Sequence, residues 1–122
     1  MTDLREAIRG LLLSVSSAVY YRGAPDDAAM PYLVFHLPQV FDDGEYTETG
    51  VLDIDGWDDA EDTAALETLM ASVNSAINKT ILPAGGINQA AFYLEHKLDL
   101  PDDDPRITRR RYTYQVKIMK GD

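Results

Sequence analysis

The sequence predicts an α+β fold in which an antiparallel sheet of about four strands packs against two helices on one face. Segment 46–79 first alternates apolar and polar residues, as in a half-buried strand, and then repeats apolar residues at three- and four-residue steps, as in a helix. The expected elements follow the order α-β-β-α-β-β with hairpin-like links in each half, which is typical of helices packed on an antiparallel sheet. With 122 residues and 45% hydrophobic content, residues 1–122 are expected to form one domain.

The first element is expected to be an amphipathic helix. Thr2 or Asp3 can cap its start, because a side-chain oxygen there accepts a hydrogen bond from a free amide of the first turn. The apolar stripe consists of Leu4, Ala7, Ile8, Leu11, Leu12, Val15, Ala18 and Val19. We expect the helix to end between Ser16 and Val19, with residues 20–21 as a short extended piece.

A long hairpin is expected next. Alternation over residues 32–38 predicts a strand, and the polar residues 39–45 predict a turn. The strand that follows places Leu52 and Ile54 on one face, so that this face can be buried while the other stays wet. The residues expected on the wet face are Val51, Asp53, Asp55 and Trp57.

The second helix is expected to start in an acidic segment of the chain. Asp58 or Asp59 can cap it, and Glu61 or Asp62 lies three residues further on, which resembles a capping box. Carboxylates are also favoured there by the positive end of the helix dipole. The apolar stripe over residues 66–77 can then pack on the buried face of the sheet.

The last third of the chain is expected to form a second strand pair. Residues 80–88 contain one proline and two glycines and are predicted to be a loop. Strands are predicted at residues 90–100 and 109–119, with an acidic, proline-containing loop between them. The first of these strands places Phe92, Leu94, His96 and Leu98 on one face, and the second does the same with Tyr112, Tyr114, Val116 and Ile118.

Charge is the most uneven property of the chain. The formal net charge is -10; ten acids and no base lie between residues 41 and 62, whereas six of the eleven bases lie between residues 106 and 120. A broad nucleic-acid-binding face is therefore disfavoured. The asymmetry can supply two different, complementary faces for self-assembly. The residues of this candidate subunit interface are Asp53, Asp55, Asp58, Asp59, Arg109, Arg110 and Arg111.

This interface hypothesis has a test and a plainer alternative. If the acidic and basic segments meet across subunits, Arg111→Glu is expected to weaken assembly while the monomer stays folded. The alternative is an acidic domain with one basic strand, whose arginines protect a sheet edge from unwanted pairing.

Two further classes of function have weak support in the sequence. The acids between Asp53 and Asp62 suggest a small acidic ligand- or calcium-binding module, but Trp57 stands where an EF-hand needs a ligand. An enzyme would have to use His36 or His96 with a nearby carboxylate, and no nucleophile or phosphate-binding motif accompanies them. The chain has no cysteine and no stretch that approaches the ~20 apolar residues of a membrane span. No cofactor, metal or catalytic residue is predicted.

The order of short motifs resembles a known family. After the amphipathic helix come Tyr21-Arg22-Gly23-Ala24-Pro25 and Pro31-Tyr32-Leu33-Val34-Phe35, and then a strand that ends in Asp55-Gly56-Trp57-Asp58 before a helix. An acidic loop and a closing Arg-Tyr-x-Tyr-x-Val strand complete the series. Over nearly its whole length the chain resembles the small tail-completion proteins of tailed bacteriophages and prophages, the tail terminator and head–tail joining group.

The resemblance implies an α+β structural protein without catalytic residues. Such a protein would assemble with itself into a ring, typically a hexamer, at the head-proximal end of the tail tube. Its partners would be the tail-tube protein and the head connector proteins, with no membrane partner. DNA would pass through the ring without sequence-specific recognition, and an acidic lumen would not grip it. The protein would belong to the virion tail and would be found in the bacterial host cytoplasm during assembly.

Overall fold

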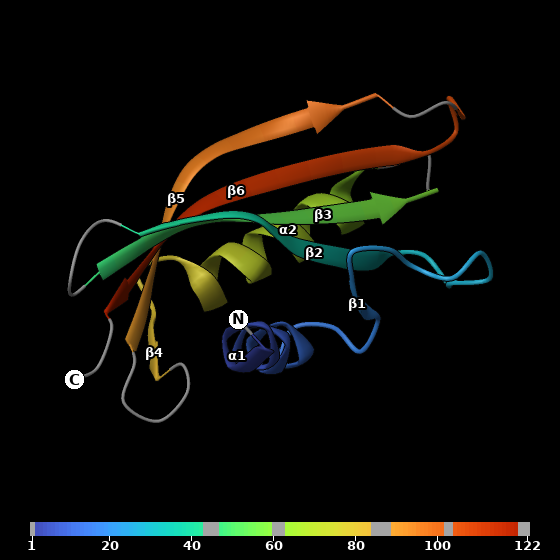
Figure 1. Ribbon diagram of the computed structural model, residues 1–122. Helices are drawn as coiled ribbons and strands as arrows, with labels where there is room; N and C mark the ends of the chain where they lie inside the picture. Colours follow the sequence, from blue (N-terminus) through green and yellow to red (C-terminus); the bar gives the residue numbers. More distant parts are fainter. Residues whose placement is uncertain (1, 43–46, 60–62, 84–88, 102–103, 120–122) are drawn as a thin grey trace.

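The computed structural model describes residues 2–42, 47–59, 63–83, 89–101 and 104–119. Its elements are α1 (Thr2–Leu13), β1 (Val19–Tyr21), β2 (Tyr32–Asp42), β3 (Thr47–Asp58), α2 (Ala64–Ile77), β4 (Ile81–Pro83), β5 (Gln89–Leu100) and β6 (Thr108–Met119). The strands form one six-stranded sheet in the order β1-β2-β3-β6-β5-β4. Both helices lie on the same side of this sheet (Figure 1). The predicted α+β class with two helices is therefore confirmed.

The prediction of about four antiparallel strands is wrong in number and in direction. β1 is an additional edge strand in the region expected to be a short extended piece, and it runs parallel to β2, with Val19 opposite Leu33. Three residues are too few to show an apolar period. The backbone amide of Leu33 donates to the carbonyl oxygen of Ala18, and that of Arg22 donates to Phe35, so main-chain bonds fix this strand.

The other additional strand, β4, lies inside the segment 80–88 that was predicted to be a loop. It follows directly from the end of α2. The backbone amide of Lys79 donates to the carbonyl oxygen of Phe92 at 2.6 Å, and the amide of Phe92 donates to Thr80 at 3.1 Å. These bonds place the chain beside β5, where Ile81 pairs with Ala91. Because the pairing is made by the backbone, the composition of the segment does not reveal it.

Two irregularities change the register of the long strands. β2 continues to Asp42, past the strand end predicted at Pro38, with a register shift between His36 and Gln39. Pro38 lies within this shift, which suits a residue that has no backbone amide to donate. The extension shortens the predicted turn at residues 39–45, whose last residues lie outside the described chain.

A second shift, between Leu94 and His96, occurs in β5. Leu94 pairs with Tyr114 on the helix-covered face, whereas His96 pairs with Thr113 on the other face. The expected alignment of His96 and Leu98 with Phe92 is therefore wrong, because one extra residue reverses the alternation of a strand.

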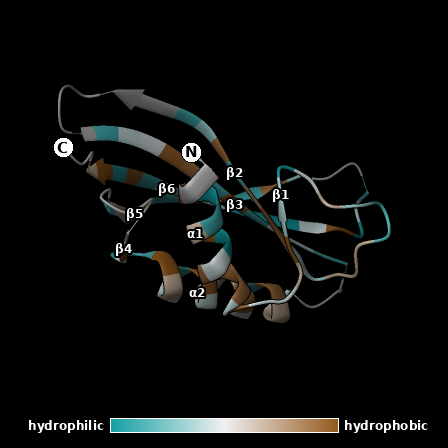
Figure 2. Ribbon diagram, turned by 60° about the horizontal axis from the view of Figure 1, so that its bottom comes forward, coloured by the Kyte–Doolittle hydropathy of each residue, from teal (hydrophilic) through white to brown (hydrophobic). Residues whose placement is uncertain are grey.

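The core fills the space between the helices and the covered face of the sheet. Figure 2 shows hydrophobic and polar residues alternating along α2, as an amphipathic helix requires. The fully buried side chains include Phe35, Leu52, Ile54, Met70, Phe92 and Tyr114, contributed by four strands and α2. The predicted inward faces of β3 and β6 are confirmed.

α2 starts later in the chain than the sequence predicted. Its N-cap is Thr63, whose side chain makes no capping hydrogen bond, and its first helical residue is Ala64. Asp58 still belongs to β3 because the sheet pairing extends to that residue, which lies opposite Thr108. Glu61 and Asp62 lie outside the described residues.

α1 ends earlier than predicted, at Leu13. The Ser14 hydroxyl donates to the carbonyl oxygen of Leu11, and the amides of Val15 and Ser16 donate to Leu12, which closes the last turn. Serine side chains compete for backbone groups in this way and favour helix ends. Neither described helix is long and apolar enough to cross a bilayer.

Tyr114→Phe is expected to lower the free energy of unfolding by about 1–2 kcal/mol at pH 7. The buried Tyr114 hydroxyl donates a hydrogen bond to Oδ1 of Asn74 at 2.9 Å, and phenylalanine would leave that oxygen without its donor. Urea denaturation of both proteins by circular dichroism measures the difference. An equal midpoint for both proteins would contradict the expectation.

The same hydroxyl is expected to make the folded protein less stable at alkaline pH. Burial raises the pKa of Tyr114 well above its usual range, so the folded state holds this proton more tightly than the unfolded state. The resulting stability is present below the unfolded pKa of about 10 and is lost as pH rises above it. Between pH 9 and pH 11, wild type is therefore expected to lose more stability than the Tyr114→Phe variant. Parallel losses would exclude Tyr114 as the cause.

Candidate functional site

One face of the sheet is not covered by the helices in the described structure (Figure 1). The central strands β2, β3 and β6 place on it the side chains that alternate with the core residues. Asp55 lies opposite Arg111 and Val34, and Asp53 lies opposite Thr113 and His36. This open face carries several of the charged residues that the sequence singled out.

Asp55 is the centre of a charged cluster on the open face. Asp55 is 3% exposed, and two arginines of β6 lie against its carboxylate. Arg109 donates to Oδ2 through Nε at 3.1 Å and Nη2 at 2.6 Å, whereas Arg111 donates through Nε to Oδ1 at 2.7 Å and through Nη2 to Oδ2 at 3.0 Å. The hydrogen bond to Asp55 raises the pKa of Arg111 further above its usual value. Such charge-assisted pairs fix the geometry of both partners.

Asp53 extends this cluster along the sheet. The Thr113 hydroxyl donates to its Oδ1 at 2.7 Å, and His36 Nε2 lies 3.6 Å from its Oδ2. Although both aspartates lie on the face that was expected to be wet, both are buried. The long neighbouring side chains of the sheet exclude water from them.

Aromatic side chains continue the open face beyond Asp55. The ring of Trp57 stacks on that of Tyr32 at a centroid distance of 6.0 Å, and Tyr20 meets Tyr32 edge to face at 5.9 Å. The guanidinium of Arg109 lies 4.4 Å from the Trp57 ring centroid. Trp57 Nε1 is buried without a hydrogen-bond partner among the described residues. Arg109 thus joins the aromatic row to the charged cluster, which gives this end of the face a fixed shape.

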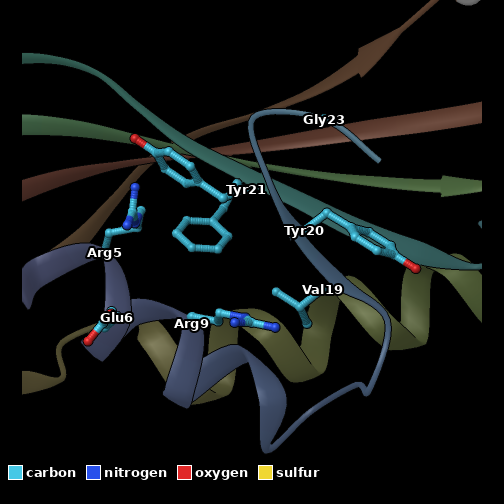
Figure 3. Close-up of a pocket in the computed structure, with 8 residues that line it drawn as sticks. Arg5, Glu6, Arg9, Val19, Tyr20, Tyr21 and Gly23 are labelled. Carbon is cyan, nitrogen blue, oxygen red and sulfur yellow. The ribbon is translucent and has the colours of Figure 1, made fainter. Parts of the chain in front are cut away.

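A separate basic site lies below the sheet, between α1 and β1. An open pocket of about 420 Å³ is lined by Arg5, Glu6, Arg9 and Tyr21, among others, so two bases and one acid face it. Figure 3 shows Arg5 extending from α1 towards Tyr21, and Arg9 extending towards β1. The guanidinium carbons of Arg5 and Arg22 lie 4.9 Å and 5.4 Å from the Tyr21 ring centroid. We call the lining residues Arg5, Arg9 and Tyr21, together with Arg22 beside the Tyr21 ring, the arginine pocket.

An acidic site lies where the end of β3 meets the loop between β5 and β6. Asp59 and Asp104 line one hollow there, and Asp99 and Asp104 line a neighbouring one. Arg106 donates to Asp104 through its side chain and backbone, which lowers the pKa of that carboxyl. Arg110 is paired with Asp99. Asp59, Asp99 and Asp104 are called the acidic corner below.

The family model described as "Tail completion protein gp17" matches residues 4–119. The chain belongs to this family. The family consists of structural proteins of the phage tail, so the predicted family and the tail structural role are confirmed. As a tail completion protein, the chain is a component of the phage particle.

Solved structures share the fold of this tail completion protein. One chain, from a structure named "Virion of native gene transfer agent (GTA) particle", superposes with a TM-score of 0.79. It is 15% identical, and the match covers 96% of this chain and 95% of that chain. Another solved chain matches with a TM-score of 0.64 and 12% identity, covering 97% and 93% of the two chains. No curated protein matches the sequence.

The structure of the tail completion protein separates the residues of the candidate interface. Asp53 and Asp55 lie with Arg109 and Arg111 in the cluster on the open face, all within one chain. Arg110 lies on the covered side, where it pairs with Asp99 and with Glu67 of α2. Of the remaining residues, Asp58 is buried at the end of β3 and Asp59 is exposed. Their role between subunits stays a prediction.

The pairing inside the chain also changes the meaning of one test. Arg111→Glu would place a carboxylate beside the buried Asp55, in contact with its hydrogen-bonding oxygens. A second carboxylate beside a buried one repels it, so this variant would damage the fold as well as any interface. It cannot separate assembly from folding, and a surface position is required instead.

The structure also bears on the calcium-binding and enzyme hypotheses. The carboxylates of Asp53 and Asp55 already accept hydrogen bonds from Thr113 and the two arginines. Within the described ranges, no group of three or more His, Asp or Glu residues is arranged to hold a metal ion. His36 lies beside Asp53, and His96 is exposed on β5.

Sequence reasoning missed the arginine pocket. Its arginines are dispersed among apolar and polar neighbours, and six other bases near the C-terminus gave a stronger signal. Arg5 and Arg9 are four residues apart, a spacing that places two side chains on one side of a helix. That spacing and the Tyr21-Arg22 pair were the available signals. Only the packing of α1 beside β1 brings them together.

Proposed function

We propose that this tail completion protein forms a closed homo-oligomeric ring, with six subunits as the expected number, that ends the tail tube at its head-proximal side. Its partners would be the tail-tube protein on one side and the head connector proteins on the other. The match to the tail completion family over residues 4–119 carries this proposal. The ring would be built in the cytoplasm of the bacterial host and would remain in the virion tail.

Two properties of the fold support a ring. A ring needs a heterologous interface, in which one surface of a subunit meets a different surface of the next. The described chain has two different surfaces that can meet in this way: the arginine pocket, and the acidic corner, where Asp59 has no ion pair with another described residue. The net charge of -10 suits an opening through which DNA passes without being held, because like charges repel.

The solution mass tests this proposal. Light scattering at low and high salt, with negative-stain images of the same sample, is expected to show closed rings of one size, either alone or after mixing with tail-tube protein. Salt is expected to loosen the rings if charged pairs hold the interface. A monomer that adds nothing to the end of tail tubes, at any salt concentration, would overturn the proposal.

A further inference from the structure

Three arginines near the start of the chain have no carboxylate within ion-pair distance among the described residues. They are Arg5 and Arg9, which line the pocket between α1 and β1, and Arg22, which lies beside the Tyr21 ring of that pocket. By contrast, every described arginine after residue 100 is paired with an aspartate of the same chain. In a protein with 21 acids and 11 bases, unpaired arginines gathered at one place are a notable excess of positive charge.

We propose that the arginine pocket binds the acidic corner of a second copy of this chain. This inference rests on the proposed ring, for which it names the two contacting surfaces. The side chain of Asp59 would enter the pocket of the neighbouring subunit and pair with Arg9. Each subunit would use one pocket and one corner, so that the contact repeats around a closed assembly.

The shape of the pocket supports a carboxylate as its occupant. The guanidiniums of Arg5 and Arg22 both lie within cation–π distance of the Tyr21 ring, which orients these two planar groups beside a residue that lines the pocket. A guanidinium has five N–H donors in a planar fork that matches a carboxylate, so its remaining donors can still bind one. Arg9 is exposed and extends towards β1 (Figure 3), where it can complete the site.

The backbone holds Arg22 in an unusual conformation. Its φ of 69° lies in the left-handed region, which costs an arginine energy that a glycine would not need. Its amide donates to the carbonyl oxygen of Phe35 at 2.9 Å, and this bond fixes the residue at the end of β1. The strained position therefore directs a basic side chain onto Tyr21, and such positions are concentrated at binding sites.

Charge complementarity favours a second copy as the source of the carboxylate. Four of the five residues from 58 to 62 are acidic, and Asp59 is one of them. Asp59 is exposed and has no ion pair with another described residue. The pocket is lined by residues of α1 and β1, whereas Asp59 follows β3 and lines a different hollow, so one subunit can offer both partners of the contact.

Disulfide trapping tests the contact directly, because the chain has no cysteine of its own. Glu6→Cys places a thiol at the lining of the arginine pocket, and Thr63→Cys places one beside the acidic corner. Both variants retain the arginines and aspartates of the proposed contact. Mixed under mild oxidation, they are expected to give cross-linked dimers at about five times the yield of Glu6→Cys mixed with Glu95→Cys. High salt should reduce this yield because it screens exposed charges.

Charge reversal then identifies the pair. Arg9→Glu in the Glu6→Cys chain should lower the yield about fivefold, and Asp59→Arg in the Thr63→Cys chain should restore it by reversing the partner as well. The matched control replaces Asp59→Arg with Glu95→Arg in the Thr63→Cys chain. With Arg9→Glu in the other chain, this control should leave the cross-linking yield at its lowered value. Yields equal to the Glu95→Cys control, or no restoration, would overturn the proposed contact.

The outcomes separate this inference from the proposed function. Rings without the cross-link would keep the ring and overturn this contact. A salt-sensitive cross-link without rings would keep the contact and overturn the ring. If Arg9→Glu leaves the cross-link unchanged but removes retention of the protein by a short DNA duplex, the pocket binds nucleic-acid phosphate and the proposal is overturned.

Discussion

Replacing Arg109 and Arg111 together with alanine is expected to lower the free energy of unfolding by about 3–5 kcal/mol at pH 7. The buried Asp55 carboxylate receives four hydrogen bonds from these two guanidiniums. Without them, a charge that is 3% exposed remains in the sheet without a partner. Urea denaturation followed by circular dichroism measures the loss.

Two further variants distinguish a buried unpaired charge from a general loss of surface arginines. The triple variant with Asp55→Ala is expected to recover part of the stability, because it removes the charge itself. Arg106→Ala, which breaks an exposed pair with Asp104, should leave the free energy of unfolding almost unchanged, because solvent screens that pair. If the triple variant were less stable than the double variant, the carboxylate would not be the source of the loss.

Gly56→Val is expected to destabilise the fold by about 1–3 kcal/mol through overpacking. A Cβ at this position of β3 would lie 2.6 Å from Met70 Sδ and 2.9 Å from Leu66 Cδ1, closer than side-chain atoms normally approach. Gly56 therefore permits α2 to approach the sheet closely. Thermal or urea denaturation measures the effect.

A rescue and a control make this prediction specific. In the double variant Gly56→Val/Met70→Ala, the space left by Met70 should accept the new methyl groups, so the combined loss is expected to be smaller than the sum of the single losses. Gly10→Ala provides a glycine control, because a Cβ there meets no atom within 4 Å. That variant should stabilise α1 by about 0.5–1 kcal/mol. Strict additivity of the Gly56 and Met70 variants would contradict the explanation.

Local residue patterns were sufficient to predict the elements with a strong apolar period. Leu52 and Ile54, and the stripe from Leu66 to Ile77, were assigned to the core because alternation and helical spacing depend only on local geometry. The order of short motifs also identified the family, which the match over residues 4–119 confirms. Element ends were less accurate, as at Leu13 and Ala64, since helix ends depend on hydrogen bonds to particular neighbours.

The pairing of strands and charged side chains follows from packing, which local residue patterns do not show. β1 and β4 are three-residue strands held by main-chain bonds to β2 and β5, and no side-chain pattern marks them. The distribution of charge along the chain suggested that Asp55 and Arg111 lie on two separate surfaces. The register of β3 and β6 instead places them opposite each other, where Arg111 donates a hydrogen bond to Asp55. The arginine pocket formed for the same reason, because α1 and β1 bring Arg5 and Tyr21 together across a loop. Periodicity reflects the geometry of residues close together in the chain, whereas contacts between distant segments depend on how the elements pack.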